Sequence, residues 1–539
     1  MAKQNVKTGK RFRAKRADKH YDTIVIGSGM GGLANAAFLS LLGKKVCVLE
    51  QHYTAGGYTH SYERKGYEWD VGVHYIGEVH KPSTLRRVFD VISEGRLQWA
   101  AMDDMYDKVI IGEKEYHFIA GRDNFAKMLK EHFPNESQVI DDYIQLIREV
   151  SRYTPKFFAG QGMPRVLGGL YNKIRPLLVP KVFFKTTREV LEEMTSNQTL
   201  ISVLTGQWGN YGQAPADAAF LMHALIAKHY LAGGAYPVGG SSEIARSIIP
   251  TIQKNGGDVF TYADVEEILI KKNKAYGVRM ADGTEITANN IVSNAGFYNT
   301  VKKLLPKDVQ TRLGVDKWCE QVQRSTGHFC IYAGFNGTAE ELGLSTTNLW
   351  IYPNGDHDHN LQKYQADHDA AFPLVYISFP SAKDPQWNNR YPNKSTVEIV
   401  TPANMDWFKQ WEGSQWQKRG EDYDAFKAKF AERLMEKLFE RHPQLRDKLD
   451  YYELSTPLST NWYQKNSAGE MLALDHFVDR FKKPFLHPDT PVKNLYMTGS
   501  DVMTAGVGGA LMAGMMTSCV MQGRKAGDVV KLLKNYQAP

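Results

Sequence analysis

The feature that most constrains this chain is a glycine-rich turn between a buried strand and a helix. Tyr21–Ile26 reads YDTIVI, and GSGMGG follows it at once, so that Gly27, Gly29 and Gly32 have the GxGxxG spacing. A helix is predicted next, ending at Gly43, and Val46–Glu50 predicts a second strand. A strand, turn, helix and strand within about 30 residues form the pattern of a dinucleotide-binding unit. The sequence therefore predicts an α/β fold with a Rossmann-like domain.

Each residue of the turn has a separate expected task. Gly27 permits the tight turn, Gly29 lets the backbone approach a pyrophosphate, and Gly32 lets helix and strand pack closely. Met30 and Gly31 begin the helix, whose N-terminus carries partial positive charge toward the phosphates. Glu50 ends the second strand, where its carboxylate would accept the ribose hydroxyls. These residues predict a dinucleotide site.

The spacing alone does not separate FAD from NAD, but three further features favour FAD. Gly56-Gly57 follows Glu50 closely, within reach of the same cofactor edge. Val265 begins a predicted strand whose backbone edge suits adenine. Near the end of the chain, a strand, a glycine and an acid read YMTGSD, and Asp501 would bind ribityl or pyrophosphate oxygens directly or through a metal or water. We therefore predict FAD as the cofactor, with covalent attachment left open.

The 539 residues are too many for one core and predict at least two domains. Residues 84–230 have a mainly helical pattern, whereas His328–Phe335, Leu349–Tyr352, Leu374–Phe379 and Thr396–Thr401 predict an antiparallel sheet, with a helix at Tyr423–Glu440. We expect a Rossmann-like FAD-binding domain interleaved with an α+β substrate domain. The expected segments are 21–83, 230–300 and 490–535 for the first domain, 84–229 and 301–489 for the second, and a basic flexible tail at 1–20.

Charge and composition limit where the chain acts. Residues 1–20 hold eight Lys or Arg and one Asp, with no apolar core of a secretory signal. This stretch is either a solvated tail or a polybasic strip that attracts anionic lipid head groups, at about 1 kcal/mol for each cation. A net charge of +7, mostly in this stretch, does not favour nucleic acid. The four cysteines have no paired spacing, so a cytoplasmic location is expected, with peripheral contact at the inner face of a membrane as an added possibility.

Ala505–Met521 is an uncharged, apolar segment whose 17 residues stand at the short limit for a bilayer span. Its four glycines lower its hydrophobicity, and we expect a buried helix against the cofactor instead.

Several segments together resemble the flavin-dependent carotenoid and retinoid oxidoreductases, a family of phytoene desaturases, carotenoid isomerases and, most similar to this chain, retinol saturases. The matching pieces lie in residues 21–80, 203–300 and 450–522, and include AGGYTHSYERKGYEWDVGVHYIG, HYLAGGAYPVGGSSEIA and NLYMTGSDVMTAGVGGALMAG. The resemblance implies a two-domain fold, FAD, and a long apolar lipid substrate whose C=C bond is saturated, desaturated or isomerised.

The same resemblance places Asp70–Gly77 near the flavin, and this segment alternates like a strand. His74 or Tyr75 is a candidate proton donor, because saturation of an alkene needs a proton as well as a hydride. The alternative is that His74 belongs to a polar support network. Tyr236 and Trp208–Tyr211 are further candidates for the pocket wall.

Other site types find less support in the sequence. No second nucleotide fingerprint is present, so the electron donor or acceptor is not identified. The His- and Asp-rich loops at 355–360 and 367–369 lack an apolar frame, and we predict no metal. Two other functions stay open: an oxygen-dependent flavin desaturase of fatty acyl chains, and a non-catalytic flavin-containing protein that binds lipid.

Overall fold

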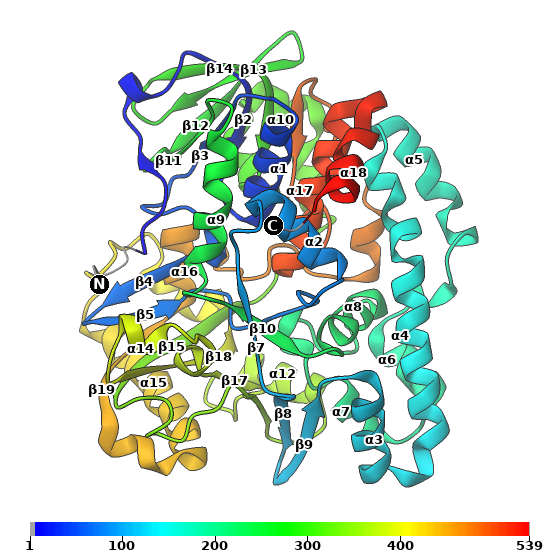
Figure 1. Ribbon diagram of the computed structural model, residues 1–539, viewed down its shortest axis with the longest axis vertical. Helices are drawn as coiled ribbons and strands as arrows, with labels where there is room; N and C mark the ends of the chain where they lie inside the picture. The colour runs from blue at the N-terminus through cyan, green and yellow to red at the C-terminus, as the bar shows by residue number, and fades with distance from the viewer. Residues whose placement is uncertain (1–5, 538–539) are drawn as a thin grey trace.

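The computed structural model describes residues 6–537, which form two large sheets with helices packed against them. In Figure 1 one of these sheets lies above the other. Helices α4 (Ser137–Phe158) and α5 (Arg165–Ile174) stand along one side of both. Segments near both ends of the described chain, residues 10–11 and 495–497, belong to the upper sheet, so residues far apart in sequence complete one domain.

The upper sheet belongs to the predicted Rossmann-like domain. Its parallel strands are β11 (Asp258–Thr261), β3 (Val46–Leu49), β2 (His20–Ile26), β14 (Glu285–Ser293) and β20 (Leu495–Met497). Beyond β14 lie the antiparallel strands β13 (Lys274–Met280) and β12 (Val265–Lys271). The expected α/β fold class is confirmed.

Three helices pack together beside these strands. Because the helices bury the strands, the strand sequences are almost continuously apolar. They are α1 (Met30–Leu41), α9 (Ser242–Gln253) and α17 (Gly506–Gln522). Gly514 of α17 lies so close to α1 that a Cβ there would stand 2.5 Å from the Gly31 carbonyl oxygen. The helix expected at the end of the chain is thus buried against α1. Among residues 6–537, no helix is both long enough and apolar enough to cross a bilayer.

The lower sheet has seven strands and is antiparallel except where β16 meets β8. Its order is β19 (Leu449–Ser455), β15 (Gly327–Asn336), β18 (Lys394–Ala403), β17 (Val375–Ser378), β16 (Asn348–Tyr352), β8 (Met105–Ile111) and β9 (Lys114–Ile119). Helix α15 (Glu421–Arg441) packs on it. The antiparallel sheet of the second domain is confirmed, and β19 is an additional edge strand.

The helical prediction for residues 84–230 is wrong for three strands within that range. They are β7 (Trp99–Ala101), β8 and β9. Strand β8 pairs with β16, about 240 residues later, so its stability comes from a pairing that no local pattern reveals. The remainder of the segment is helical: α2 (Thr84–Ser93), α3 (Arg122–His132), α4 (Ser137–Phe158), α5 (Arg165–Ile174), α6 (Thr187–Met194), α7 (Gln198–Leu204) and α8 (Phe220–Tyr230).

The basic flexible tail expected at 1–20 is wrong from Val6 onward. Strand β1 (Lys10–Arg11) pairs in parallel with β11 at the edge of the upper sheet. Val6 and Phe12 are buried, and the Phe12 ring meets Phe260 edge-on at 5.8 Å. The two apolar side chains among the cations attach this segment to the domain. Residues 1–5 lie outside the described part of the chain.

Candidate cofactor and substrate site

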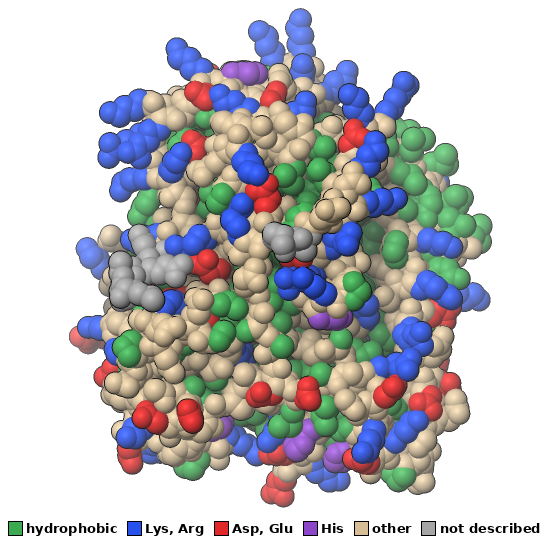
Figure 2. All heavy atoms as spheres, viewed as in Figure 1, with side chains coloured by type: hydrophobic (Ala, Val, Ile, Leu, Met, Phe, Trp, Pro, Cys, Tyr) green, Lys and Arg blue, Asp and Glu red, His purple; other side chains and the backbone are tan. Residues whose placement is uncertain are grey.

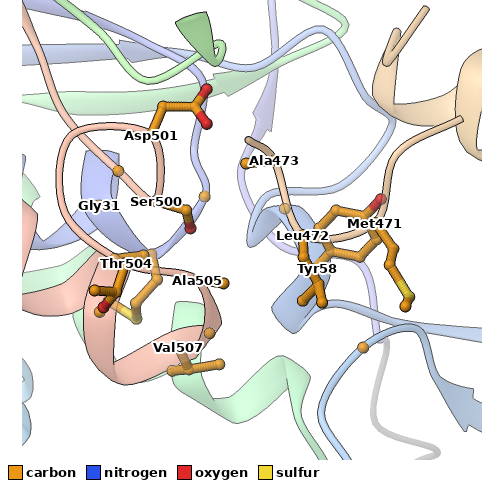
Figure 3. A pocket seen from close by; sticks show the side chains of 18 of the residues that line it. Gly31, Tyr58, Met471, Leu472, Ala473, Ser500, Asp501, Thr504, Ala505 and Val507 are labelled. Carbon is orange, nitrogen blue, oxygen red and sulfur yellow. The ribbon is translucent and has the colours of Figure 1, made fainter. Parts of the chain in front are cut away.

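A cavity of about 1130 Å³ lies between the two sheets. It begins at the carboxyl ends of β2, β3, β14 and β20, where ligands bind in open α/β sheets. Figure 3 shows one end of it, with Ser500 and Thr504 on one side and Tyr58, Met471 and Leu472 on the other. A typical small-molecule site occupies about 300–1,000 Å³. The cavity is therefore large enough for a dinucleotide together with part of a second ligand.

All of the predicted cofactor-binding and proton-donor residues except Gly32 line this cavity. They are Gly27, Gly29, Met30, Gly31, Glu50, Gly56, Gly57, His74, Tyr75, Val265 and Asp501. Gly32 lies behind the turn, where a Cβ would stand 2.2 Å from the Gly27 carbonyl oxygen. Gly32 therefore allows the helix and the strand to pack closely, which is the task expected of it.

The glycines bring three separate segments to backbone contact. A Cβ on Gly57 would lie 2.8 Å from the Gly29 Cα, and one on Gly31 would lie 2.7 Å from the Gly499 Cα. Such distances are too short for any real side chain. The N-terminus of α1, the Gly56-Gly57 loop and the loop after β20 therefore form one cradle of backbone groups. Its shape and its helix N-terminus fit the phosphates of a dinucleotide.

The Glu50 side chain lines the cradle and also stabilises it through hydrogen bonds. One carboxylate oxygen accepts hydrogen bonds from the Ser28 backbone N–H at 2.8 Å and the Ser28 hydroxyl at 2.7 Å, and the other accepts from the His52 N–H at 2.8 Å. The Gly56 N–H donates to the same Ser28 hydroxyl at 3.0 Å. The carboxylate thus fixes the glycine turn, a task that the sequence did not indicate, beside its predicted role toward a ribose.

Asp501 likewise fixes two loops of the wall. Its oxygens accept from the backbone N–H groups of Phe297 at 2.5 Å and Leu474 at 2.9 Å. The side chain is buried and joins segments that follow β14 and precede β20. Direct binding of ribityl or pyrophosphate oxygens by Asp501 stays a prediction.

The other half of the cavity is apolar and contains residues that the sequence did not single out. Its wall includes Phe158, Met222, Leu225, Trp350, Tyr376 and Met516. Within the described chain, His328 Nδ1, Trp350 Nε1 and Thr498 Oγ1 are buried atoms of the cavity wall without a hydrogen-bond partner. Such atoms are costly unless a ligand or water satisfies them. The apolar wall therefore suits a long apolar ligand.

His74 lies in the cavity wall and bonds to a buried acid. Its Nδ1 is 2.8 Å from an Oε of Glu398 on β18, and the second Glu398 oxygen accepts the Asp70 N–H at 2.9 Å. Burial lowers the pKa of His74 to about 3 and raises the pKa of Glu398 well above its usual range. Both shifts favour a neutral imidazole beside a protonated carboxyl, whose O–H would then donate to Nδ1. In that tautomer Nε2 carries the proton.

The strand expected over Asp70–Gly77 is wrong for its middle. Strand β5 (Tyr67–Asp70) ends at Asp70 and β6 (Ile76–Gly77) begins at Ile76, with a loop between them. The hydrogen bonds of Asp70 and His74 to Glu398 hold this loop against the lower sheet in place of strand pairing.

Tyr75, the second candidate donor, has its hydroxyl engaged elsewhere. It donates to Asp107 at 2.8 Å, and the ring stacks on Tyr230 at 4.1 Å between centroids. Burial raises the pKa of Tyr75 well above its usual range. The ring forms part of the wall, and of the two candidates the geometry favours His74.

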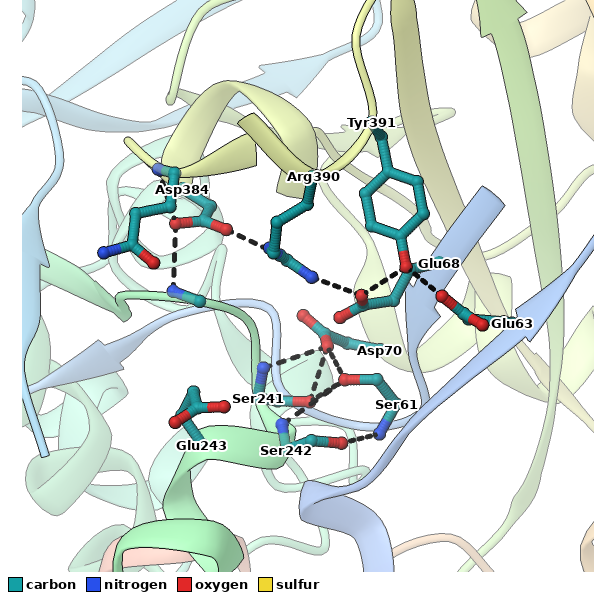
Figure 4. A network of polar contacts seen from close by, with 12 residues as sticks. Ser61, Glu63, Glu68, Asp70, Ser241, Ser242, Glu243, Asp384, Arg390 and Tyr391 are labelled. Carbon is teal, nitrogen blue, oxygen red and sulfur yellow. Dashed lines mark hydrogen bonds and ion pairs between the residues drawn. The ribbon is translucent and has the colours of Figure 1, made fainter. Parts of the chain in front are cut away.

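A buried polar network supports the same loop from behind. Figure 4 shows Asp70 accepting from Ser61 and Ser241, while Arg390 pairs with Glu68 and Asp384. Tyr236 donates to Asp70 and is not in the cavity wall, so the structure does not support it as a pocket residue. Of the alternative stretch at 208–211, Gly209 and Asn210 do line the cavity.

The loop expected at 355–360 is wrong from His357 onward, where helix α12 (His357–Ala366) begins, and both candidate metal segments have protein partners. His357 is buried with Nε2 2.9 Å from the Ser202 carbonyl oxygen, and Asp358 pairs with Arg188. Asp367, His368 and Asp369 bring ligand atoms within 4.8 Å of one another near the surface, where Asp369 pairs with Lys429. The absence of a metal stays a prediction.

Comparison with known proteins identifies the family. Residues 25–92 match the NAD(P)-binding Rossmann-like domain family. The all-trans-retinol 13,14-reductase of Danio rerio is 37% identical over 95% of this chain and 88% of its own length, and that of Homo sapiens is 36% identical over 97% and 89%. The chain belongs to the all-trans-retinol 13,14-reductase family. The resemblance expected from sequence is thereby confirmed, and so is the prediction of an oxidoreductase.

More distant similarities are found to other proteins, both by sequence and by fold. The chloroplastic prolycopene isomerase of Daucus carota is 24% identical over 84% of this chain and 71% of its own length. Among solved structures, an oxidoreductase from Methanosarcina mazei has a TM-score of 0.61 at 19% identity, covering 92% of this chain and 98% of its own. Putrescine oxidase has a TM-score of 0.58 at 15% identity, covering 95% and 99%. These structures support the fold.

Proposed function

We propose that this protein binds FAD and saturates a C=C bond of a retinoid-like lipid. The observation that carries the proposal is one continuous cavity that joins a dinucleotide cradle to an apolar wall. Family membership supports the reaction class, because the relatives at 36–37% identity are named for reduction of a retinol C=C bond. We infer a peripheral encounter with membranes, where such lipids reside.

The residues present fit FAD by the shape of the cradle. Close approach of Gly29 to Gly57 and of Gly31 to Gly499 leaves backbone groups, not side chains, to face the phosphates. The N-terminal residues of α17, Ala505–Gly508, also line the cavity, and a helix N-terminus stabilises negative charge. When bound, FAD supplies hydride transfer chemistry.

The protein's own task is to orient the lipid and to provide a proton. Met222 and Leu225 of the cavity wall would exclude water from the chain of the lipid. His74 Nε2 would donate a proton to one carbon of the C=C bond, and the other carbon would receive the hydride. Glu398 would pass its own proton to Nδ1 as Nε2 loses one, so that the imidazole ends neutral. Glu398 is therefore a positioning and proton-supplying residue.

The test compares Glu398→Gln with the wild-type protein under single turnover. The flavin is photoreduced without oxygen, all-trans-retinol is added, and flavin reoxidation and the lipid product are followed. Loss of the proton-supplying group is expected to slow reoxidation by about 10²–10⁴-fold. The rate should also change its pH profile, while FAD content and melting temperature stay near those of the wild type. An unchanged rate and profile in Glu398→Gln would remove Glu398 from the reaction.

A lipid screen separates this function from the two alternatives. Lipids extracted from cells with and without the gene are compared by mass spectrometry. Retinoids that gain two hydrogens support the proposal, whereas altered acyl chains with unchanged retinoids would support the fatty acyl desaturase. A bound flavin that reacts with neither lipid nor oxygen would support a non-catalytic lipid-binding protein.

A further inference from the structure

Helix α5 presents an unusual apolar face to solvent. Six hydrophobic side chains of α5 and the turn after it are exposed, which we name the α5 patch: Val166 (79%), Leu167 (56%), Leu170 (62%), Ile174 (47%), Leu177 (86%) and Leu178 (40%). Val166, Leu170 and Ile174 are four residues apart and so share one face of the helix. Figure 2 shows hydrophobic side chains gathered at the upper right, over α5. A clustered apolar surface of this kind marks an interaction site.

The chain segment that carries the α5 patch has charges of one sign. Residues 150–188 contain eight Lys or Arg and no Asp or Glu. Arg152, Lys156, Arg165, Lys173 and Lys181 are exposed. An apolar helical face with cations beside it is the composition of helices that lie in the interface of an anionic bilayer. Two copies of this surface would bring like charges together, which disfavours self-association through it.

The α5 patch also adjoins the cavity. A Cβ on Gly168 of α5 would lie 2.3 Å from the Gly160 carbonyl oxygen, and the Tyr171 hydroxyl donates to the Lys156 carbonyl at 2.7 Å. Phe158 and Ala159, in the segment that α5 covers, line the cavity. A bilayer held on this side of the molecule would therefore lie next to the wall of the lipid-binding half.

We propose that the α5 patch seats the protein on the surface of an anionic lipid bilayer, with Leu170 and Leu177 inserted among the lipids. The basic residues that flank them bind the head groups. The surface is separate from the residues of the reaction, so its test needs no turnover and can fail while the proposed function stands.

The test measures flotation of the full protein with vesicles of phosphatidylcholine, with or without phosphatidylserine. We expect the wild type to bind the anionic vesicles, and the Leu170→Asp/Leu177→Asp variant to bind about tenfold more weakly or worse. Tyr452→Asp is the matched control, because Tyr452 is an exposed hydrophobic side chain on β19, far from α5 in Figure 1. It should bind as the wild type does, and all three should keep the same melting temperature.

The Lys173→Glu/Lys181→Glu variant should lose more binding to the vesicles with phosphatidylserine than to the vesicles of phosphatidylcholine alone. If the wild type does not bind vesicles, or the Leu170→Asp/Leu177→Asp variant binds equally well, the proposal is overturned. A dimer in sedimentation velocity that this variant dissociates, without vesicle binding, would assign the patch to a second copy and also overturn it.

Should the double variant fail to fold, Leu177→Trp tests the same contact. The exposed side chain would shift its fluorescence to the blue and be quenched by brominated lipids. Unchanged, unquenched emission of this tryptophan would contradict insertion.

Discussion

The cradle can be tested by adding one methyl group to Gly57. The φ angle of Gly57 is 56°, and a Cβ there would meet the Gly29 Cα at 2.8 Å, whereas ordinary contacts begin at 3.4 Å. Gly57→Ala therefore carries two costs. A left-handed backbone costs an alanine about 1–2 kcal/mol, and overpacking in a tight contact costs about 1–3 kcal/mol more.

Gly43 provides the matched control. It also has a positive φ, 80°, but a Cβ there meets nothing within 4 Å. Gly43→Ala thus has the backbone cost without the clash, and it lies outside the cavity wall. If FAD binds only when Gly29 and Gly57 touch, the clash alone weakens binding by about 5- to 150-fold, since 1.4 kcal/mol is a factor of ten.

The assay is titration of apoprotein with FAD by flavin fluorescence, with melting temperature recorded for each variant. Both variants should lose some thermal stability, but only Gly57→Ala should lose FAD affinity. Equal FAD affinity of the two variants would refute the claim that contact between the two glycine segments shapes the cofactor site.

Three further predictions concern the framework. Glu50→Ala should leave less FAD bound after dialysis, because the Ser28 and His52 donors lose an acceptor worth about 1.5–3 kcal/mol; an unchanged flavin load would contradict this. Arg390→Met should destabilise the protein by about 3–5 kcal/mol in urea unfolding, since it leaves two buried carboxylates unpaired, whereas Lys409→Met, which breaks an exposed pair, should not change the midpoint. Stability should also fall as pH is lowered from 6.5 to 4, because burial lowers the pKa of seven histidines to about 3 or 4, so the unfolded chain takes up protons that the folded chain does not. Buried acids with raised pKa values act in the opposite direction, because the folded chain takes up their protons first. Each histidine beyond the number of these acids lowers the free energy of unfolding by about 1.4 kcal/mol per pH unit of acidification. A melting temperature that holds or rises on acidification would contradict this prediction. The histidines are His52, His60, His74, His223, His229, His328 and His357.

The cofactor half was predictable because its signals are local. The turn from Gly27 to Gly32, Glu50 and Gly56-Gly57 stand within 31 residues of one another. Gly27, Gly56 and Gly57 have positive φ angles that few other residues adopt, and Glu50 supplies a carboxylate at the end of a strand. The distant Asp501 segment was found through its strand, glycine and acid, and it does line the same cavity.

The substrate half depends on pairings between distant residues, which the sequence does not reveal. Glu398 is recognisable as a partner of His74 only once β18 lies beside the loop after β5. His328 reads as an ordinary strand residue until its unpaired Nδ1 is seen at the cavity. The prediction for the first residues was wrong for a different reason. Their many cations indicate a solvated tail, but the apolar Phe12 is buried and attaches them to the upper sheet.

The central claim is that the bound flavin reduces a retinoid C=C bond. It is tested most directly by anaerobic single turnover of the photoreduced wild-type protein with all-trans-retinol. The account predicts that retinol reoxidises the flavin and leaves as a product heavier by two hydrogens. A flavin that stays reduced until oxygen is admitted, with the retinol recovered unchanged, would contradict it.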